Sequence, residues 1–284
     1  MVEEIRSVAV IGAGVMGAAI AAHVANAGVP VKLLDIVRPG LEGRNSVGEA
    51  AIERLKKAKP APLMSARNAR LITPGNIEDD LEGLRDCDWI IEAVAEDIGI
   101  KRNLYRSLAR VRKPGSVVSS NTSTIPLHEL TAEMPVALKP DFCITHFFNP
   151  PRYMRLLELV TGPDTRPEAT NRLASFCDVM LGKSVLRCKD TPGFIANRIG
   201  AFWVQTALVL ALEMGLEVEE ADAVMGKPMG FPATGVFGLM DLVGIDLGPH
   251  VNASLARLLP ENDAFHAMNR DLSIIRDMIG QGYT

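Results

Sequence analysis

The sequence predicts an α/β protein in which a doubly wound, mostly parallel sheet is followed by a second, all-helical domain. Three observations favour this class. An apolar run at residues 7–11 leads into the glycine-rich stretch GAGVMG and an alanine-rich helical pattern. Apolar, strand-like runs then alternate with helical patterns as far as Lys189. Beyond that residue the strand patterns vanish, and long helical patterns fill the rest of the chain.

The first unit of the predicted sheet is a strand, a helix and a second strand. Residues 7–11 form the first strand, and the helix after GAGVMG ends near Gly28, because glycine adopts the backbone of a helix end at low cost. The second strand ends at Asp35. The polar, basic segment that follows is predicted to be helical until Pro60 and Pro62 interrupt it.

Six more strands are predicted before the domain boundary, which is placed near Lys189. Their sequences are ARLITPG, CDWIIEAVAE, GSVVSSNTST, DFCITHFF, RLLELVTG and SVLRCKD. Helical patterns separate most of these strands, notably at residues 99–114 and 165–183. Residues 1–189 are therefore expected to form the α/β domain.

The second domain, residues 190–284, is expected to be mainly helical. Helices are predicted from Phe194 to Met214 and from Val218 to Val224. The long apolar stretch at 199–216 contains a glutamine, a threonine and a glutamate, so it is interpreted as a buried helix and not as a membrane span.

Composition argues against several classes of protein. The formal net charge is −4, whereas general nucleic-acid binders carry a basic excess. The four cysteines are scattered without CxxC spacing, which argues against a disulfide framework or a zinc site and favours a reducing compartment. The N-terminus is acidic and enters a strand at once, so no signal peptide is expected. We therefore expect a cytoplasmic protein without a metal, a membrane span or a nucleic-acid partner.

The stretch GAGVMG places Gly12, Gly14 and Gly17 in GxGxxG spacing, directly after a strand and at the start of a helix. The first glycine allows a tight turn, the second lets the backbone approach a pyrophosphate, and the third lets helix and strand pack closely. The helix start, where Val15 and Met16 lie, supplies N–H donors for phosphate oxygens. This context is typical of the Rossmann-type dinucleotide-binding fold. A purely structural glycine turn is the alternative.

Asp35 favours NAD as the dinucleotide. It closes the second strand, where a carboxylate can accept hydrogen bonds from both ribose hydroxyls and would repel the 2′-phosphate of NADP. Arg38 lies nearby and is the residue that argues for NADP. FAD uses a similar fingerprint, but the rest of the chain carries no other sign of a flavoprotein.

Two apolar runs joined by a Pro-Pro turn, FCITHFFNPPRYMRLLELV, each carry one conspicuous polar residue, His146 and Glu158. If the runs are antiparallel strands, the two side chains come within hydrogen-bonding reach, and the carboxylate raises the basicity of the other imidazole nitrogen. That nitrogen could take a proton from a substrate hydroxyl while hydride leaves the same carbon for nicotinamide. The alternative is a core histidine with a structural carboxylate partner.

Further polar residues lie after the carboxyl ends of strands, where ligands of open α/β sheets bind. Asn121, Thr122 and Ser123 follow the strand GSVVS, although Ser123 or Thr124 could instead cap the next helix. Asn197 lies early in the first helix of the second domain, near a domain boundary of the kind where ligands often bind. Its alternative role is that of an ordinary polar residue on a solvated helix.

The motifs IGAGVMG, EAVAED, SSNTST, THFFNPP, LLELV and CKDTPGFIANR together resemble the L-3-hydroxyacyl-CoA dehydrogenase family of fatty-acid β-oxidation. The resemblance covers the predicted NAD-binding domain and the start of the helical domain. It implies oxidation of a 3-hydroxyacyl-CoA to a 3-ketoacyl-CoA, with NAD as cofactor and an acyl-CoA as substrate.

Carried over by motif, the resemblance implies roles for the candidate residues. His146 would be the catalytic base, with Glu158 as its partner. Ser123 and Asn197 would bind the hydroxyl or carbonyl region of the substrate. The glutamate and lysine of EDIGIK would lie near the nicotinamide and its ribose. The cofactor-binding residues added in this way are Ala95, Glu96, Lys101 and Asn121.

The chain also departs from the family pattern. A Pro-rich interruption follows the basic segment that would touch the CoA nucleotide, and PATGVFGLMD stands where the family has a PMGPFELLD-like loop. Family chains run on past GYT, so we expect a truncated helical domain or part of a longer multifunctional protein. The apolar helix from Phe194 to Leu216 suggests a homodimer, and an internal core helix is its alternative.

Two other functions stay open at this point. One is a short-chain 3-hydroxyacid dehydrogenase acting on a free acid, in which Arg152 or Arg198 would bind the carboxylate. The other is a catalytically incomplete NAD-binding fragment, in which a truncated helical domain leaves the site unfinished.

Overall fold

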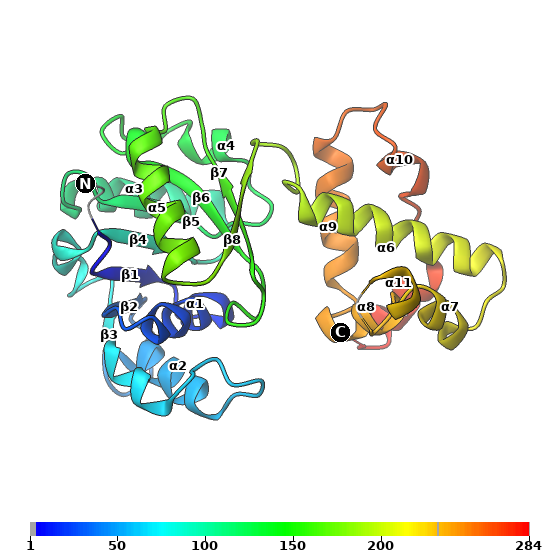
Figure 1. Cartoon of the computed structure of the whole chain (residues 1–284), viewed down its shortest axis with the longest axis horizontal. Helices are drawn as coiled ribbons and strands as arrows, with labels where there is room; N and C mark the ends of the chain where they lie inside the picture. Colours follow the sequence, from blue (N-terminus) through cyan, green and yellow to red (C-terminus); the bar gives the residue numbers. More distant parts are fainter. Residues whose placement is uncertain (1–3, 232, 284) are drawn as a thin grey trace. The chain divides into compact units, whose positions relative to one another are not determined.

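The computed structural model describes residues 4–231 and 233–283. The chain divides into two compact units, Met1–Thr191 and Pro192–Thr284 (Figure 1). The first unit is an α/β domain and the second is helical. The first unit ends two residues beyond Lys189, and within it Asp190 still bonds to the backbone at Leu127.

One eight-stranded sheet forms the centre of the first unit, in the order β3-β2-β1-β4-β5-β6-β7-β8. All neighbouring strands are parallel except β6 and β7, which are antiparallel. This arrangement confirms the predicted doubly wound, mostly parallel sheet. The strands are β1 (Val8–Ile11), β2 (Val31–Asp35), β3 (Ile72–Asn76), β4 (Trp89–Glu92), β5 (Val117–Ser120), β6 (Phe142–Phe147), β7 (Leu156–Val160) and β8 (Ser184–Cys188).

The order of the strands places the ligand edge of the sheet. After β3 the chain crosses to the other side of β1 and forms β4, so the strand order reverses between β1 and β4. Ligands of open α/β sheets bind at such a switch point, outside the carboxyl ends of the strands. All residues of β1 and β4 are buried, and this explains their unbroken apolar sequences, VAVI and WII.

Five α-helices of the first unit pack around this sheet. They are α1 (Val15–Asn26), α2 (Ser46–Lys57), α3 (Ile98–Val111), α4 (Leu127–Thr131) and α5 (Pro167–Val179). Short 3-10 helices lie at Ala66–Leu71, Leu81–Asp86 and Lys139–Asp141. One continuous apolar core joins α1, α2 and α5 to the sheet. The helix α2 ends three residues before Pro60, in line with the predicted break.

The second unit contains helices and no strands among its described residues. They are α6 (Ala196–Glu213), α7 (Val218–Val224), α8 (Phe237–Val243), α9 (Leu247–Leu258), α10 (Phe265–Met268) and α11 (Ser273–Gly280), with a 3-10 helix at Lys227–Met229. The helix α6 starts later than predicted because Gly193 and Phe194 both have positive φ angles. Its apolar side packs against α8 and α11.

No helix in the described part of the chain is long and apolar enough to cross a bilayer. The four cysteines are buried and free of disulfides.

Candidate active site

The three glycines of the GxGxxG stretch differ in what an added side chain would meet. A side chain on Gly12, whose φ is +106°, would put its Cβ 2.3 Å from the carbonyl oxygen of Ala93. A Cβ on Gly17 would lie 1.8 Å from the carbonyl oxygen of Gly12. Gly14 has no heavy atom within 4 Å of such a Cβ. Packing therefore requires the outer two glycines, whereas the space over Gly14 is open to a ligand.

The start of α1 offers donors to that space. Gly14 is the N-cap residue, and no side chain caps the helix, so the first-turn N–H groups, including those of Val15 and Met16, lack helical acceptors. Val15 is 75% exposed there, while Met16 packs on the core. Phosphate groups bind well at helix starts of this kind. These features fit the pyrophosphate of a dinucleotide.

Asp35 lies at the carboxyl end of β2, beside the glycine-rich turn. Its Oδ2 accepts a hydrogen bond from Ala13 N, and its Oδ1 accepts one from Ile36 N at 2.7 Å. The carboxylate therefore fixes the turn as well as marking the expected ribose position. Arg38 is exposed on the segment that follows.

His146 and Glu158 are direct partners in the antiparallel pairing of β6 and β7. Glu158 Oε2 lies 2.8 Å from His146 Nδ1, and Ser123 Oγ lies 3.0 Å from His146 Nε2. The glutamate is fully buried and the histidine is 3% exposed. Since an ionised carboxylate only accepts hydrogen bonds, Nδ1 carries the proton and Nε2 presents its lone pair toward Ser123.

Two further side chains lie next to this pair. The ring of Phe148 packs edge-on against His146, with 4.5 Å between ring centres. Burial, together with the adjacent Glu158 carboxylate, raises the pKa of Cys188 to about 11. The thiol is therefore protonated at neutral pH, so it adds no second negative charge beside the glutamate.

Ser123 belongs to the loop after β5 and does not cap a helix. The N–H groups at the start of α4 are instead bound by Asp190, with Leu127 N at 2.7 Å and His128 N at 2.9 Å from its carboxylate oxygens. The alternative of a cap at Ser123 or Thr124 is therefore wrong. Asp190, which follows β8, caps α4 instead. Nothing in the sequence around α4 indicates this contact.

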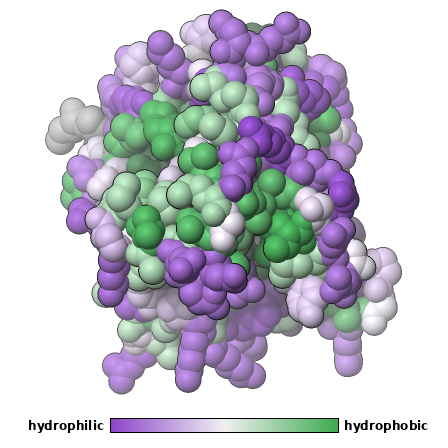
Figure 2. Space-filling model, turned by 90° about the vertical axis from the view of Figure 1, so that its right-hand side faces the viewer, coloured by the Kyte–Doolittle hydropathy of each residue, from purple (hydrophilic) through white to green (hydrophobic). Residues whose placement is uncertain are grey.

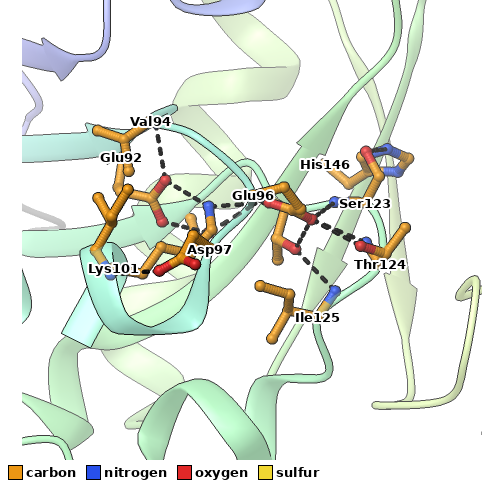
Figure 3. A network of polar contacts seen from close by, with 12 residues as sticks. Glu92, Val94, Glu96, Asp97, Lys101, Ser123, Thr124, Ile125 and His146 are labelled. Carbon is orange, nitrogen blue, oxygen red and sulfur yellow. Dashed lines mark hydrogen bonds and ion pairs between the residues drawn. The ribbon is translucent and has the colours of Figure 1, made fainter.

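The loop that carries Ser123 is held by Glu96. Its Oε1 accepts hydrogen bonds from Ser123 N at 3.1 Å, from Thr124 N at 3.2 Å and from the hydroxyls of Thr122 and Thr124 (Figure 3). Its Oε2 lies 3.1 Å from Lys101 Nζ. Partial burial raises the pKa of Glu96, but the Lys101 charge and the Thr122 hydroxyl outweigh it, so the pKa lies below its ordinary value.

Most other predicted site residues gather at the same sheet edge. Ala95 lies exposed in the loop between β4 and α3. Asn121 follows β5, and its Oδ1 accepts a hydrogen bond from Phe147 N at 3.0 Å, which ties the β5 loop to β6. Asn197 belongs to the first turn of α6 in the second unit, and its role stays a prediction.

Both arginines considered for a free carboxylate already have partners. Arg152 Nη1 donates to the carbonyl oxygens of Ala61, at 2.6 Å, and Leu63, at 3.2 Å. Arg198 forms an ion pair with Asp263. The sequence alone could not show these contacts, because each joins segments far apart in the chain.

The fold and the glycine turn together define a dinucleotide-binding α/β protein, and a buried histidine–carboxylate pair lies at the edge of its sheet. The family model "3-hydroxyacyl-CoA dehydrogenase, NAD binding domain" matches residues 7–191, and the model of the C-terminal domain of the same family matches residues 193–281. The chain belongs to the 3-hydroxyacyl-CoA dehydrogenase family, whose cofactor is NAD.

Relatives support this assignment. A putative fatty acid oxidation complex trifunctional enzyme of Rickettsia felis is 42% identical over 98% of this chain, which spans 39% of that protein. A probable 3-hydroxyacyl-CoA dehydrogenase of Deinococcus radiodurans is 42% identical over 92% of this chain and 76% of its own. The crystal structure of FadB2 from M. tuberculosis superimposes with a TM-score of 0.83 at 30% identity, covering 99% of this chain and 95% of that one. The chain thus spans about two fifths of the trifunctional relative.

Proposed function

We propose that this protein oxidises an L-3-hydroxyacyl-CoA to the 3-ketoacyl-CoA with NAD, as a step of fatty-acid β-oxidation. The observation that carries the proposal is the bonded set Glu158–His146–Ser123, with Nδ1 of the imidazole held at 2.8 Å and Nε2 facing Ser123 at 3.0 Å. It lies at the carboxyl edge of the same sheet that carries the dinucleotide fingerprint.

In the proposed reaction His146 Nε2 removes the proton of the 3-hydroxyl group. Bound NAD would supply the acceptor for the hydride that leaves the carbon bearing this hydroxyl group. Glu158 keeps the proton on Nδ1 and stabilises the imidazolium that forms, since it is buried and bonded to that nitrogen. Ser123 binds the same substrate oxygen and orients it toward Nε2. In the reverse direction the imidazolium returns the proton to the carbonyl oxygen.

The thioester is favoured over a free acid as substrate. The Deinococcus radiodurans relative is by name a probable 3-hydroxyacyl-CoA dehydrogenase, and the two arginines considered for a free carboxylate are engaged elsewhere. The test is NADH oxidation with acetoacetyl-CoA and, separately, with free acetoacetate. Turnover with the thioester alone supports the proposal. Turnover with acetoacetate at a comparable kcat/KM would favour the hydroxyacid reaction, and NADH binding without turnover would favour an incomplete fragment.

We also propose that the helical unit pairs with a second copy of the chain. In the helical unit, the exposed large hydrophobic side chains include Leu210, Leu212, Met214 and Leu216 at the end of α6 and beyond. Figure 2 shows a face of the molecule on which hydrophobic residues gather. Patches of this kind mark association surfaces. Light scattering should give the mass of a dimer, and Met214→Lys, an exposed change, should shift it to a monomer. A monomeric wild-type protein would contradict the pairing.

The proposed place of action is the cytoplasm. The support is the set of four buried, free thiols, a state that a reducing compartment maintains.

A further inference from the structure

A buried carboxylate, Glu92, lies near the site but takes no part in the proposed proton and hydride transfers. It is the last residue of β4, and its side chain is 0% exposed. Oε1 accepts hydrogen bonds from Lys101 Nζ at 2.7 Å and from Val94 N at 3.0 Å. Oε2 accepts them from the hydroxyls of Tyr105, at 2.6 Å, and Ser120, at 2.7 Å. One carboxylate thus joins β4, β5 and α3 at the edge where the site lies.

Lys101 links this carboxylate to a second one. Its Nζ lies 2.7 Å from Glu92 Oε1 and 3.1 Å from Glu96 Oε2, and its side chain is 1% exposed. The ammonium group of Lys101 is buried between the two carboxylates. Removing either carboxylate would leave a buried charge poorly paired, which strongly destabilises the fold. Glu92 is buried and hydrogen-bonded through both oxygens, so it holds the ammonium group of Lys101 in place. Lys101 in turn holds Oε2 of Glu96 in place.

Glu96 passes this constraint to Ser123. With its other oxygen it accepts the N–H groups of Ser123 and Thr124 and the hydroxyls of the two threonines that flank Ser123 (Figure 3). Ser123 Oγ in turn lies 3.0 Å from His146 Nε2. The polar contacts therefore run from the interior at Glu92 to the imidazole without a break.

We propose that Glu92 is a positioning residue for the reaction: through Lys101 and Glu96 it fixes the backbone of residues 122–124 and so holds Ser123 Oγ at His146 Nε2. The inference rests on the proposed function, since it assigns Ser123 and His146 the roles given there. A displacement of about 1 Å at a reacting group is enough to lower turnover by up to about a hundredfold.

The test compares Glu92→Gln with Asp88→Asn. Asp88 is a buried carboxylate directly before the same strand, at its other end, where it accepts hydrogen bonds from Arg6 N at 2.7 Å and Lys113 Nζ at 2.6 Å. Both substitutions remove one buried negative charge and keep the side-chain shape. Glu92→Gln is expected to lower kcat about tenfold, while Asp88→Asn keeps kcat within about twofold of the wild type.

The decisive measurement repeats Glu92→Gln in the Ser123→Ala background. If Glu92 acts through Ser123, its substitution costs less than about twofold there, because coupled residues are not additive. An equal loss of kcat in both backgrounds, or in Asp88→Asn, would overturn the inference.

Amide hydrogen exchange gives a result that needs no turnover. In Glu92→Gln the N–H groups of Ser123 and Thr124 should exchange faster, while Asp88→Asn leaves them unchanged. Unchanged exchange in Glu92→Gln would overturn the inference even where the thioester assay fails, whereas a failed assay of the wild type contradicts only the proposed reaction. If Glu92→Gln does not fold, Tyr105→Phe removes a donor from the same carboxylate and should show the same exchange pattern.

Discussion

At the scale of single residues, Asp35 is the residue predicted to determine which dinucleotide binds. It sits at the end of β2 and bonds to the glycine-rich turn through Ala13 N. Asp35→Ala should weaken NADH binding and raise the ratio of NADPH to NADH affinity on the order of tenfold, because the repulsion of the 2′-phosphate is removed. Fluorescence titration with both nucleotides measures the ratio. If the substitution only loosened the turn, the binding of both nucleotides would weaken equally. An unchanged ratio of the two affinities would therefore contradict the role of Asp35 at the ribose.

His23 makes the stability of the first unit depend on pH. It is buried in α1, where its Nε2 lies 3.0 Å from the carbonyl oxygen of Leu181. Burial lowers its pKa to about 4, and the nearby charge of Lys183 adds to the effect. The unfolded chain therefore binds the proton more tightly than the folded one between pH 6.5 and 4.

The stabilising contribution of neutral His23 is complete above pH 6.5 and is lost as the pH falls toward 4. The loss is on the order of 3 kcal/mol. His23→Gln retains a donor for Leu181 and does not titrate, so its free energy of unfolding should fall less steeply over this range than that of the wild type. His250→Gln, at an exposed site, is the control. Parallel curves for the wild type and His23→Gln would contradict the assignment.

At the scale of elements, the three glycines of one turn should respond differently to alanine. Gly17→Ala forces a Cβ onto the backbone of Gly12, at 1.8 Å, and should lower the free energy of unfolding by about 2 kcal/mol or more. Gly14→Ala meets open space, so it should keep the wild-type melting temperature and weaken NADH binding by about tenfold. Calorimetry and NADH titration separate the two effects. A destabilised Gly14→Ala with normal NADH affinity would contradict the reading of the turn.

The sequence predicted those parts of the fold and site whose signals are local or periodic. In an extended strand every second side chain lies on the same face, which places His146 and Glu158 on faces shared with apolar residues. The Pro-Pro turn between the two strands allows them to run antiparallel, and in the structure the two residues are direct partners. The GxGxxG spacing identified the turn between β1 and α1 in the same way. Both follow from a few adjacent residues, so no knowledge of distant contacts was needed.

The supporting acids were missed because their partners lie on other elements of the fold. Glu92 ends the strand WIIE, but its donors come from the loop after β4, from α3 and from β5. The feature of the sequence that could have indicated the role of Glu92 is a single glutamate at the end of an otherwise apolar strand. Asp190 lies 63 residues after Leu127, the first residue of the helix that it caps, and no spacing rule reaches so far.

At the scale of the whole molecule, we expect the first unit alone to bind NAD, whereas turnover is expected to need both units. The first unit, Met1–Thr191, contains the complete sheet and the glycine turn. A chain of residues 1–191 should fold and bind NADH with an affinity within about threefold of the full chain. It should not oxidise NADH with acetoacetyl-CoA, because it lacks Asn197, which is predicted to bind the substrate. Thioester-dependent turnover by the truncated chain would show that the second unit is dispensable for chemistry.

His146, oriented by Glu158, is proposed to be the base of a thioester-dependent dehydrogenase. The most direct measurement compares acetoacetyl-CoA-dependent NADH oxidation by the wild type and by His146→Gln, at equal saturation with NADH. We expect the variant to bind NADH as the wild type does and to turn over about 10²–10⁴-fold more slowly, the usual effect of removing an acid–base group. Equal rates for the two proteins would contradict the role of His146 as the base.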